Sequence, residues 1–297
     1  MINYSVRELE CFRAVAEELS FTTASKRLHL AQPPISRHIK ALEQRLGATL
    51  FNRNKRQVSL TPAGTVFLRE TNGLLSHLKR AEEAVGAFQH SRKQRLHVGF
   101  VSALLSDGLV SIFQDFKRSD PNIEVTLHDR PPTAQIEALR NGELDIGFVG
   151  LLPEAPEPFL EFHLWKKEPL CILHPVGHWL EKRKLVRIEE LEQENLAMIQ
   201  ANTAPAFVDF IRNLFVNAHI QPRITQEASR AQAVALMALT GSCIAILPAC
   251  ACEAIPQAQH CKLKDANKKP VSIDLMVATR KVGTRACQQF LETAVAT

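Results

Sequence analysis

The residues best suited to chemistry in this 297-residue chain are hydrogen-bond donors and cations gathered between positions 32 and 40. Gln32, Ser36, Arg37 and Lys40 recur at helical spacing and therefore share one face of a helix. Amide, hydroxyl and guanidinium groups read base edges in the major groove, and ammonium groups neutralise phosphates. An ordinary amphipathic helix with a solvated basic face has the same pattern, so the surroundings must decide.

Charge around this segment favours DNA binding. Residues 19–61 hold eight Lys or Arg against one acid, Glu43. Residues 1–61 hold ten Lys or Arg and five Asp or Glu, whereas residues 62–297 hold 26 of each. The whole excess of +5 thus lies where it can replace phosphate counterions.

Two helices joined by a tight turn should position the basic face. Ser20 or Thr22 can cap the first, and the second is expected from Gln32 to Leu46. A proline pair fits its first turn, where N–H groups have no intrahelical partner, and Gly47 ends it. The stripe expected to be buried is Ile35, Ile39, Leu42 and Leu46. A preceding helix over 6–19 should support the pair through Val6, Leu9, Phe12, Val15, Ala16 and Leu19.

Residues 50–61 follow the second helix and predict a hairpin wing. Two short apolar segments flank a basic tip that holds Arg53, Lys55 and Arg56. Such a tip can contact the DNA backbone or the minor groove beside a helix in the major groove.

Together these residues resemble the winged helix-turn-helix of LysR-type transcriptional regulators. The resemblance is carried by Ser20-Phe21-Thr22, Ala24, Leu28, Ala31 to Ser36, Ile39, Leu42-Glu43, Leu46-Gly47, Leu50-Phe51, Arg53, Leu60-Thr61 and Ala63-Gly64. One departure is Ser25, where that family usually has alanine. The residues expected to contact double-stranded DNA are Thr22, Lys26, Gln32, Pro33, Pro34, Ser36, Arg37, Lys40, Arg53, Lys55 and Arg56.

A long helix should follow from Pro62 to about Gln89, because Thr61-Pro62 is a strong helix start. Its apolar positions alternate in spacings of four and three, as in a coiled coil: Phe67, Thr71, Leu74, Leu78, Ala81, Val85 and Phe88. Packing against its own domain is the alternative, but residues 4–61 already form a complete small domain. We therefore expect a homodimer. The family resemblance implies the same role for this linker helix, and tetramers built from two dimers.

Beyond a polar hinge at 90–95, strands and helices alternate and predict an α/β module with parallel strands. The first strands are expected at 96–101, 123–127 and 144–149, with helices at 105–118 and 132–141. A second unit has strands at 170–174, 197–200, 223–226 and 243–247, with helices at 205–218 and 229–239. The chain is expected to cross between the two units at 151–159 and again at 265–270. A last strand, 271–277, and helix, 284–294, should then return to the first unit.

The expected fold is α/β overall, with a winged helix-turn-helix (4–61), a linker helix (62–90) and a two-lobed module (91–297). Lobe I should span about 91–160 and 268–297, and lobe II about 161–267. The module resembles the periplasmic-binding-protein-like effector domain of LysR-type regulators. Residues 141–147 and Ile246-Leu247-Pro248 carry this weaker resemblance.

Two-lobed modules bind small molecules between the lobes, at strand carboxyl ends and helix amino ends. The effector contacts expected on this basis are Val101, Ser102, Ala103, Pro132, Thr133, Gln200, Asn202, Thr203 and Phe207. Plain helix capping would equally explain the three hydroxyl residues in that set. Three helices are expected to begin at this cleft: the one after Ser102, the one after Pro132 and the one after Thr203. Helix amino ends attract negative charge, so the predicted effector is a small carboxylate.

Two other classes of protein are considered and disfavoured. For an enzyme, the chain lacks a Gly-x-Ser-x-Gly motif, a phosphate loop and a dinucleotide fingerprint. An extracytoplasmic solute-binding protein would begin with a signal peptide, unlike residues 1–18 here. The interpretation is a cytoplasmic regulator without membrane contact that works with RNA polymerase if it is an activator.

No metal or cofactor is expected. The seven cysteines do not form a recognised zinc pattern, and buried apolar thiols are the simpler interpretation of the Cys250-Ala251-Cys252 segment.

Overall fold

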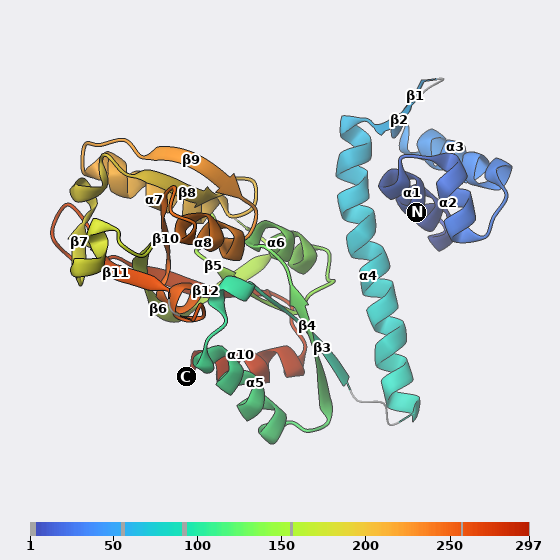
Figure 1. The fold of residues 1–297 in the computed structure, drawn as a ribbon. Helices are drawn as coiled ribbons and strands as arrows, with labels where there is room; N and C mark the ends of the chain where they lie inside the picture. Colours follow the sequence, from blue (N-terminus) through green and yellow to red (C-terminus); the bar gives the residue numbers. More distant parts are fainter. Residues whose placement is uncertain (1–3, 55–56, 91–93, 155–156, 257, 297) are drawn as a thin grey trace. The chain divides into compact units, whose positions relative to one another are not determined.

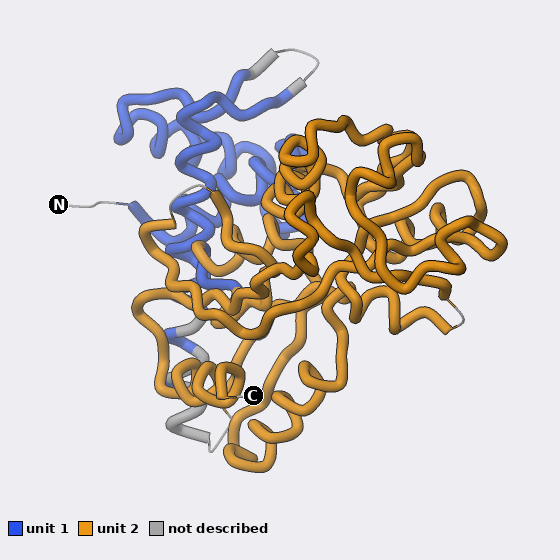
Figure 2. The backbone as a smooth tube through the Cα atoms, turned by 90° about the vertical axis from the view of Figure 1, so that its left-hand side faces the viewer, with its two compact units in different colours: residues 1–92, 141–143 blue, residues 93–140, 144–297 orange. Residues whose placement is uncertain are grey.

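The computed structural model describes residues 4–54, 57–90, 94–154, 157–256 and 258–296 (Figure 1). The chain divides into two compact units, residues 1–92 with 141–143 and residues 93–140 with 144–297 (Figure 2). Among the described helices, none is long and apolar enough to cross a membrane.

The first unit is a small helical domain with a hairpin and a long helix. Its elements are α1 (Val6–Glu18), α2 (Phe21–Leu28), α3 (Gln32–Leu46), β1 (Phe51–Asn54), β2 (Gln57–Leu60) and α4 (Pro62–His90). Phe12, Ile35, Ile39 and Leu42 are fully buried in its core.

Two residues expected in this core are instead exposed. Val6 is 45% exposed because it is the first residue of α1, at the end of the helix, where neighbouring elements do not cover its side chain. Leu19 is 48% exposed, since it is the C-cap of α1 and adopts the left-handed conformation that ends the helix (φ 47°).

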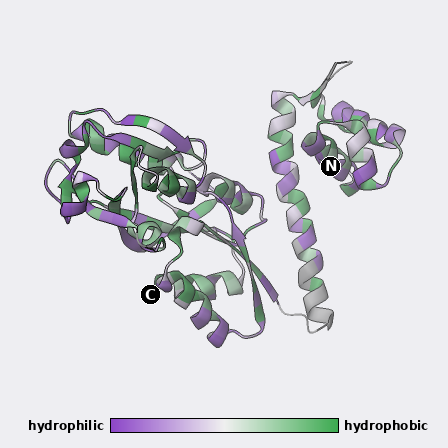
Figure 3. Cartoon of the chain, viewed as in Figure 1, coloured by the Kyte–Doolittle hydropathy of each residue, from purple (hydrophilic) through white to green (hydrophobic). Residues whose placement is uncertain are grey.

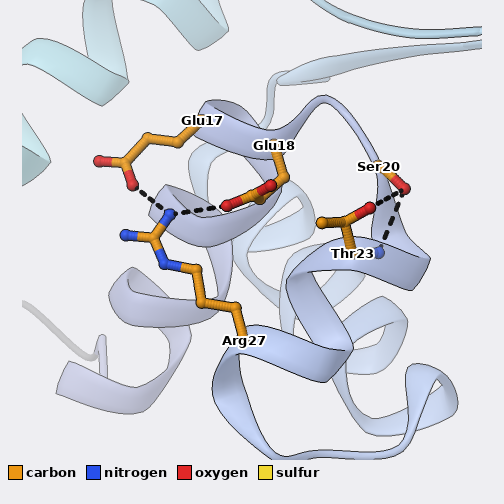
Figure 4. Close-up of polar contacts among 5 residues, drawn as sticks. All are labelled: Glu17, Glu18, Ser20, Thr23 and Arg27. Atoms are coloured by element: carbon orange, nitrogen blue, oxygen red, sulfur yellow. Dashed lines mark hydrogen bonds and ion pairs between the residues drawn. The ribbon is translucent and has the colours of Figure 1, made fainter.

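Local capping explains where these helices begin and end. The Ser20 hydroxyl accepts a hydrogen bond from the Thr23 amide at 3.2 Å and caps α2 (Figure 4). The N-cap of α3 is Ala31 without a side-chain bond, which is tolerable because the following Pro33 and Pro34 have no N–H group to satisfy. Gly47 ends α3 with φ 65°.

Strands β1 and β2 form the antiparallel wing, with Phe51 opposite Leu60. Glu43, the only acid between residues 19 and 61, holds the base of the wing. Its Oε1 accepts hydrogen bonds from the amides of Leu50 at 2.9 Å and Phe51 at 3.3 Å. This acid therefore ties the wing to α3.

Hydrophobic and hydrophilic residues alternate along α4 (Figure 3). Phe67 packs against the core of the first unit. Further along, Leu74, Leu78 and Val85 are 60%, 40% and 59% exposed. The side chain of Phe88 lies outside the described part of the chain.

The first lobe of the second unit is a five-stranded sheet in the order β4-β3-β5-β12-β6. Its strands are β3 (Gln94–Phe100), β4 (Ile123–Asp129), β5 (Ile146–Gly150), β12 (Ser272–Arg280) and the first part of β6 (Leu160–His174). The first three are parallel, as predicted, but β12 runs antiparallel to both of its neighbours, β5 and β6, and makes the sheet mixed. Helices α5 (Asp107–Ser119) and α10 (Arg285–Val295) cover one face, and α6 (Pro132–Arg140) the other.

The second lobe is built on the last part of β6, in the order β6-β10-β8-β9, with β11 and β7 on a side branch. Its strands are β7 (Leu185–Arg187), β8 (Asn195–Ile199), β9 (Arg223–Ala228), β10 (Ile244–Pro248) and β11 (Gln259–Lys264). Its helices are α7 (Pro205–Asn217), α8 (Ala231–Leu239) and α9 (Ala249–Glu253), with short 3-10 turns η2 (Trp179–Lys182) and η3 (Ile188–Leu191).

The chain first passes between the lobes within one continuous strand, β6, rather than in a loop near residue 160. Residues 160–169 of β6 pair with β12 in the first lobe, and residues 170–174 pair with β10 and β11 in the second. The first lobe therefore extends about ten residues beyond the boundary expected from sequence. Charged residues such as Glu161 and Lys167 recur along this stretch, so it lacks the apolar pattern from which a strand is predicted.

Two glycines allow α6 to lie close on the sheet. Gly99 of β3 and Gly147 of β5 are register partners, and a β-carbon on either would stand 2.8 or 2.7 Å from Oε1 of Gln135. The Gln135 amide donates to the carbonyls of Arg130 at 2.9 Å and Phe148 at 3.2 Å. This buried side chain thereby fixes the amino end of α6.

Candidate DNA interface and effector cleft

The outward face of α3 carries the polar residues expected to meet DNA. Gln32, Pro33, Arg37 and Lys40 are exposed. Pro34 and Ser36 are half-buried, and Thr22 and Lys26 are exposed on α2. Among the described residues, Lys26, Arg37 and Lys40 form no ion pair, so their charges are available to a ligand.

Two other cations of this region stabilise the fold instead. Nη1 of Arg27 lies 2.6 Å from Glu17 and 3.1 Å from Glu18 at the end of α1 (Figure 4). Arg45 is paired with the buried Glu8. Burial alone would raise the pKa of Glu8, but hydrogen bonds from the Ser5 amide and Arg45 lower it below its usual value. The basic excess available to DNA is therefore smaller than the sequence count suggests.

The wing is described only in part. Arg53 belongs to β1, where its backbone pairs with Val58, but its side chain is outside the described part of the structure. Lys55 and Arg56 lie outside the described residues altogether. Their expected contacts with DNA stay predictions.

A cavity of about 590 Å³ lies between the two lobes of the second unit. Seven of the nine residues expected at an effector site line it: Val101, Ser102, Ala103, Pro132, Thr133, Thr203 and Phe207. Gln200 and Asn202 are not among its lining residues. The Gln200 backbone holds the turn before α7, where its amide donates to Ala228 and its carbonyl accepts from Thr203. The Asn202 carbonyl accepts from the Thr133 hydroxyl of the other lobe at 3.4 Å.

The three hydroxyl residues have different roles in the cleft. The Thr133 hydroxyl, in the first lobe, donates to the carbonyl of Thr203, in the second, at 3.2 Å. The Ser102 hydroxyl accepts from Gln232 of α8 at 3.1 Å. The Thr203 hydroxyl lies 3.3 Å from Oδ1 of Asn202. Plain capping does not describe Ser102 or Thr203, because neither is the N-cap of its following helix.

Three helices begin at the cavity, although not the three expected. Ser102 opens a 3-10 turn, η1 (Ser102–Leu104), and α5 starts only at Asp107. The third helix is instead α8, whose first residues Ala231 and Gln232 line the cavity beside the starts of α6 and α7. Among the described residues, the backbone N–H groups of Thr133, Phe207 and Gln232 donate to no acceptor. They can therefore bind a ligand.

Sequence reasoning missed the charged residues of the cleft. The lining includes Asp129, Arg140, Glu154, Glu157, Asp209 and Arg230. Asp129 ends β4 and Arg230 is the N-cap of α8. Both positions adjoin predicted element ends, so the rule that ligands meet strand carboxyl ends and helix starts could have found them. Within the described chain, no group of three or more His, Cys, Asp or Glu could hold a metal ion.

Comparisons with known proteins cover both units. Residues 6–65 match the model of the bacterial regulatory helix-turn-helix protein, lysR family, and residues 89–297 match the LysR substrate binding domain. The uncharacterized HTH-type transcriptional regulator YnfL of Escherichia coli (strain K12) is 34% identical over 84% of this chain and 83% of its own. The HTH-type transcriptional regulator AlsR of Bacillus subtilis (strain 168) is 31% identical over 83% and 81%.

Solved structures agree along nearly the whole chain. The crystal structure of CbnR, a LysR family transcriptional regulator, has a TM-score of 0.74 and 26% identity, covering 98% of both chains. Full-length CbnR complexed with its target DNA has a TM-score of 0.73 and 27% identity, with the same coverage. The names of these relatives describe transcriptional regulators, and the two matched domains are a helix-turn-helix and a substrate binding domain. The chain belongs to the LysR family of DNA-binding transcriptional regulators, with an amino-terminal helix-turn-helix and a carboxyl-terminal effector-binding domain.

Proposed function

We propose that this regulator senses a small organic carboxylate in the cleft between its lobes. The observation that carries the proposal is the meeting of three helix amino ends, those of α6, α7 and α8, at one cavity. Each end offers N–H groups and partial positive charge to an anion. Ile136, Ile199, Phe207 and Leu275 supply an apolar wall for the body of the ligand.

Calorimetry on the full-length protein tests the effector class, with small aromatic and aliphatic acids compared with their neutral amides. Acids should bind more tightly, because only they place negative charge at the helix ends. Ser102→Val and Thr203→Val should weaken acid binding, while Thr240→Val, at the far end of α8, serves as the control. Equal binding of acids and amides, or unchanged binding in both variants, contradicts the proposal.

On DNA, α3 lies in the major groove in this proposal. Gln32, Pro33, Ser36 and Arg37 then face bases, and Lys40 faces phosphate. Thr22, Lys26 and Pro34 border the same surface, and the wing residues Arg53, Lys55 and Arg56 complete the backbone contacts. The exposure of Arg37 and Lys40 without acidic partners in the described structure supports this arrangement.

Dimerisation occurs through α4 in this proposal. Leu74, Leu78 and Val85 are exposed on a helix of 29 residues, and apolar side chains spaced in heptads are stabilised by a second copy. A dimer presents two recognition helices to a two-fold symmetric site.

A second self-association surface would join dimers into tetramers. An apolar groove of about 300 Å³ on the first lobe is lined by Phe100, Leu105, Val110, Phe113 and Leu127, among others. Three of these side chains are 41–50% exposed. Burying them against a second effector domain would be favourable.

The regulator acts on cytoplasmic DNA and, if it is an activator, on RNA polymerase.

A further inference from the structure

A carboxylate of the protein itself occupies the effector cleft. Oδ1 of Asp129, at the end of β4, accepts a hydrogen bond from the Ser102 amide at 3.1 Å. Oδ2 of the same side chain lies 3.2 Å from Nη1 of Arg230. Ser102 and Asp129 belong to the first lobe and Arg230 to the second, so one carboxylate bridges the cleft. All three residues line the cavity.

Gln232 closes this bridge into a ring of contacts. Its side-chain amide, in the first turn of α8, donates to the Ser102 hydroxyl at 3.1 Å. Asp129 and Ser102 on one lobe thus each contact a residue at the amino end of α8 on the other. The position beside that helix end is therefore one where this structure already accommodates a carboxylate.

Two arginines line the cavity, and they are held very differently. Arg140 makes two contacts with Glu157, one of them at 2.8 Å, and the Glu157 side chain is only 4% exposed. Arg230 makes one contact with Asp129, and these side chains are 65% and 38% exposed. A two-pronged pair with a buried carboxylate is strong, whereas an exposed single-contact pair contributes little. Arg230 is thus the arginine that can exchange its partner.

We propose that Asp129 is an internal stand-in for the effector carboxylate, and that Arg230 is the residue that recognises the effector. The inference rests on the proposed carboxylate effector. An incoming acid takes the place of Asp129 at Arg230 and also gains the N–H groups of Ala231 and Gln232 at the start of α8. Asp129 turns towards solvent, and one bridge between the lobes is released. A neutral amide carries no negative charge with which to displace the Asp129 carboxylate from Arg230.

Calorimetry on the full-length protein tests the exchange, with benzoate, phenylacetate and succinate as probes beside benzamide, phenylacetamide and succinamide. The variants are Asp129→Asn, Arg230→Gln and Arg230→Lys. Glu124→Gln is the matched control, because Glu124 forms an exposed ion pair with Arg95 within the first lobe, at 3.3 Å. It removes one carboxylate of the same sheet without touching the cleft.

Asp129→Asn should tighten acid binding roughly two- to fivefold, the range allowed by loss of an exposed competing pair, and leave amide binding unchanged. Arg230→Gln should weaken acid binding by about tenfold or more and leave only the smaller preference for acids that the helix amino ends provide. Arg230→Lys should keep part of the preference for acids, which a purely structural role for Arg230 would not require. Glu124→Gln should match the wild type.

The exchange alone is overturned if an acid binds the wild type and both Asp129→Asn and Arg230→Gln behave like Glu124→Gln. If none of the acids binds any variant, the carboxylate effector and the exchange fail together.

Discussion

Gly64, in the first turn of α4, lies directly against Leu50: a β-carbon at position 64 would stand 2.1 Å from the Leu50 carbonyl oxygen. The Gly64 amide also donates a hydrogen bond to the Thr61 hydroxyl at 2.9 Å, and this bond caps the start of α4. This contact joins the start of the long helix to the strand that leads into the wing. Only glycine permits so close an approach.

Gly64→Ala should therefore destabilise the DNA-binding unit by about 1–3 kcal/mol or more, the usual cost of overpacking. Urea unfolding followed by circular dichroism measures the change. Gly108→Ala is the control, since a β-carbon there would meet nothing closer than 4.0 Å. It should be neutral or stabilise by up to about 1 kcal/mol. Equal stability of both variants would show that α4 can shift away from Leu50.

Glutamate at Leu74 and Leu78 should convert the dimer into monomers that bind DNA poorly. Charge in an apolar coiled-coil seam loses hydrophobic burial and adds repulsion between the two copies. Sedimentation at micromolar concentration gives the mass. Val216→Glu is the control, since Val216 is 62% exposed on α7 and lies outside the seam. A monomeric wild type would refute dimerisation through α4.

The cysteine thiols should be unreactive in the folded protein. Each of the seven is buried, and burial raises the pKa of Cys171 to about 11 and of Cys250 and Cys261 to about 12. The thiolate is the reactive form, so little of it exists near neutral pH. A thiol-disulfide reagent at pH 8 should titrate none in native protein and seven in denaturant. Rapid reaction of a native thiol would contradict this and reopen a redox role.

The first unit could be predicted from sequence because its determinants are local. The bounds of α3, for example, follow from residues within or next to the helix: its apolar periodicity, the proline pair in its first turn and Gly47 at its end. The exposed Val6 and Leu19 were misjudged because periodicity identifies a helix face but not where its neighbours stop.

The second unit was harder to predict because its determinants lie far apart in sequence. The parallel strands followed from alternating patterns, but β7, β11 and the first part of β6 carry charged, half-exposed residues and were missed. The pairing of Asp129 with Arg230 joins residues 101 positions apart, and no local pattern reveals it. The cleft lining could thus be predicted in outline but not its charges.

His174 should make the protein less stable in mild acid. Burial lowers the pKa of this side chain below its ordinary value of 6.5, so the unfolded chain binds the proton more readily than the folded one. The contribution is fully present above about pH 6.5 and is lost as the pH falls below that value towards the lower folded pKa. Urea unfolding at pH 7.5 and 5.5 should show a larger loss for the wild type than for His174→Gln. His219→Asn replaces an exposed histidine and should behave like the wild type. Equal losses in all three proteins would refute the assignment.

Arg37 and Lys40 should contribute to DNA binding in different ways. If Arg37 contacts a guanine with both guanidinium nitrogens, Arg37→Ala costs about 1–3 kcal/mol on the cognate site and relaxes sequence preference there. Lys40→Ala should weaken binding to all sequences alike and lower the salt dependence by about one phosphate contact.

Arg27→Ala is the informative control, because Arg27 is already paired with Glu17 and Glu18 and should affect folding more than DNA affinity (Figure 4). Fluorescence anisotropy with cognate and random duplexes over a salt series separates these effects. An Arg37→Ala variant that folds normally and keeps full affinity and preference would remove α3 from the major groove.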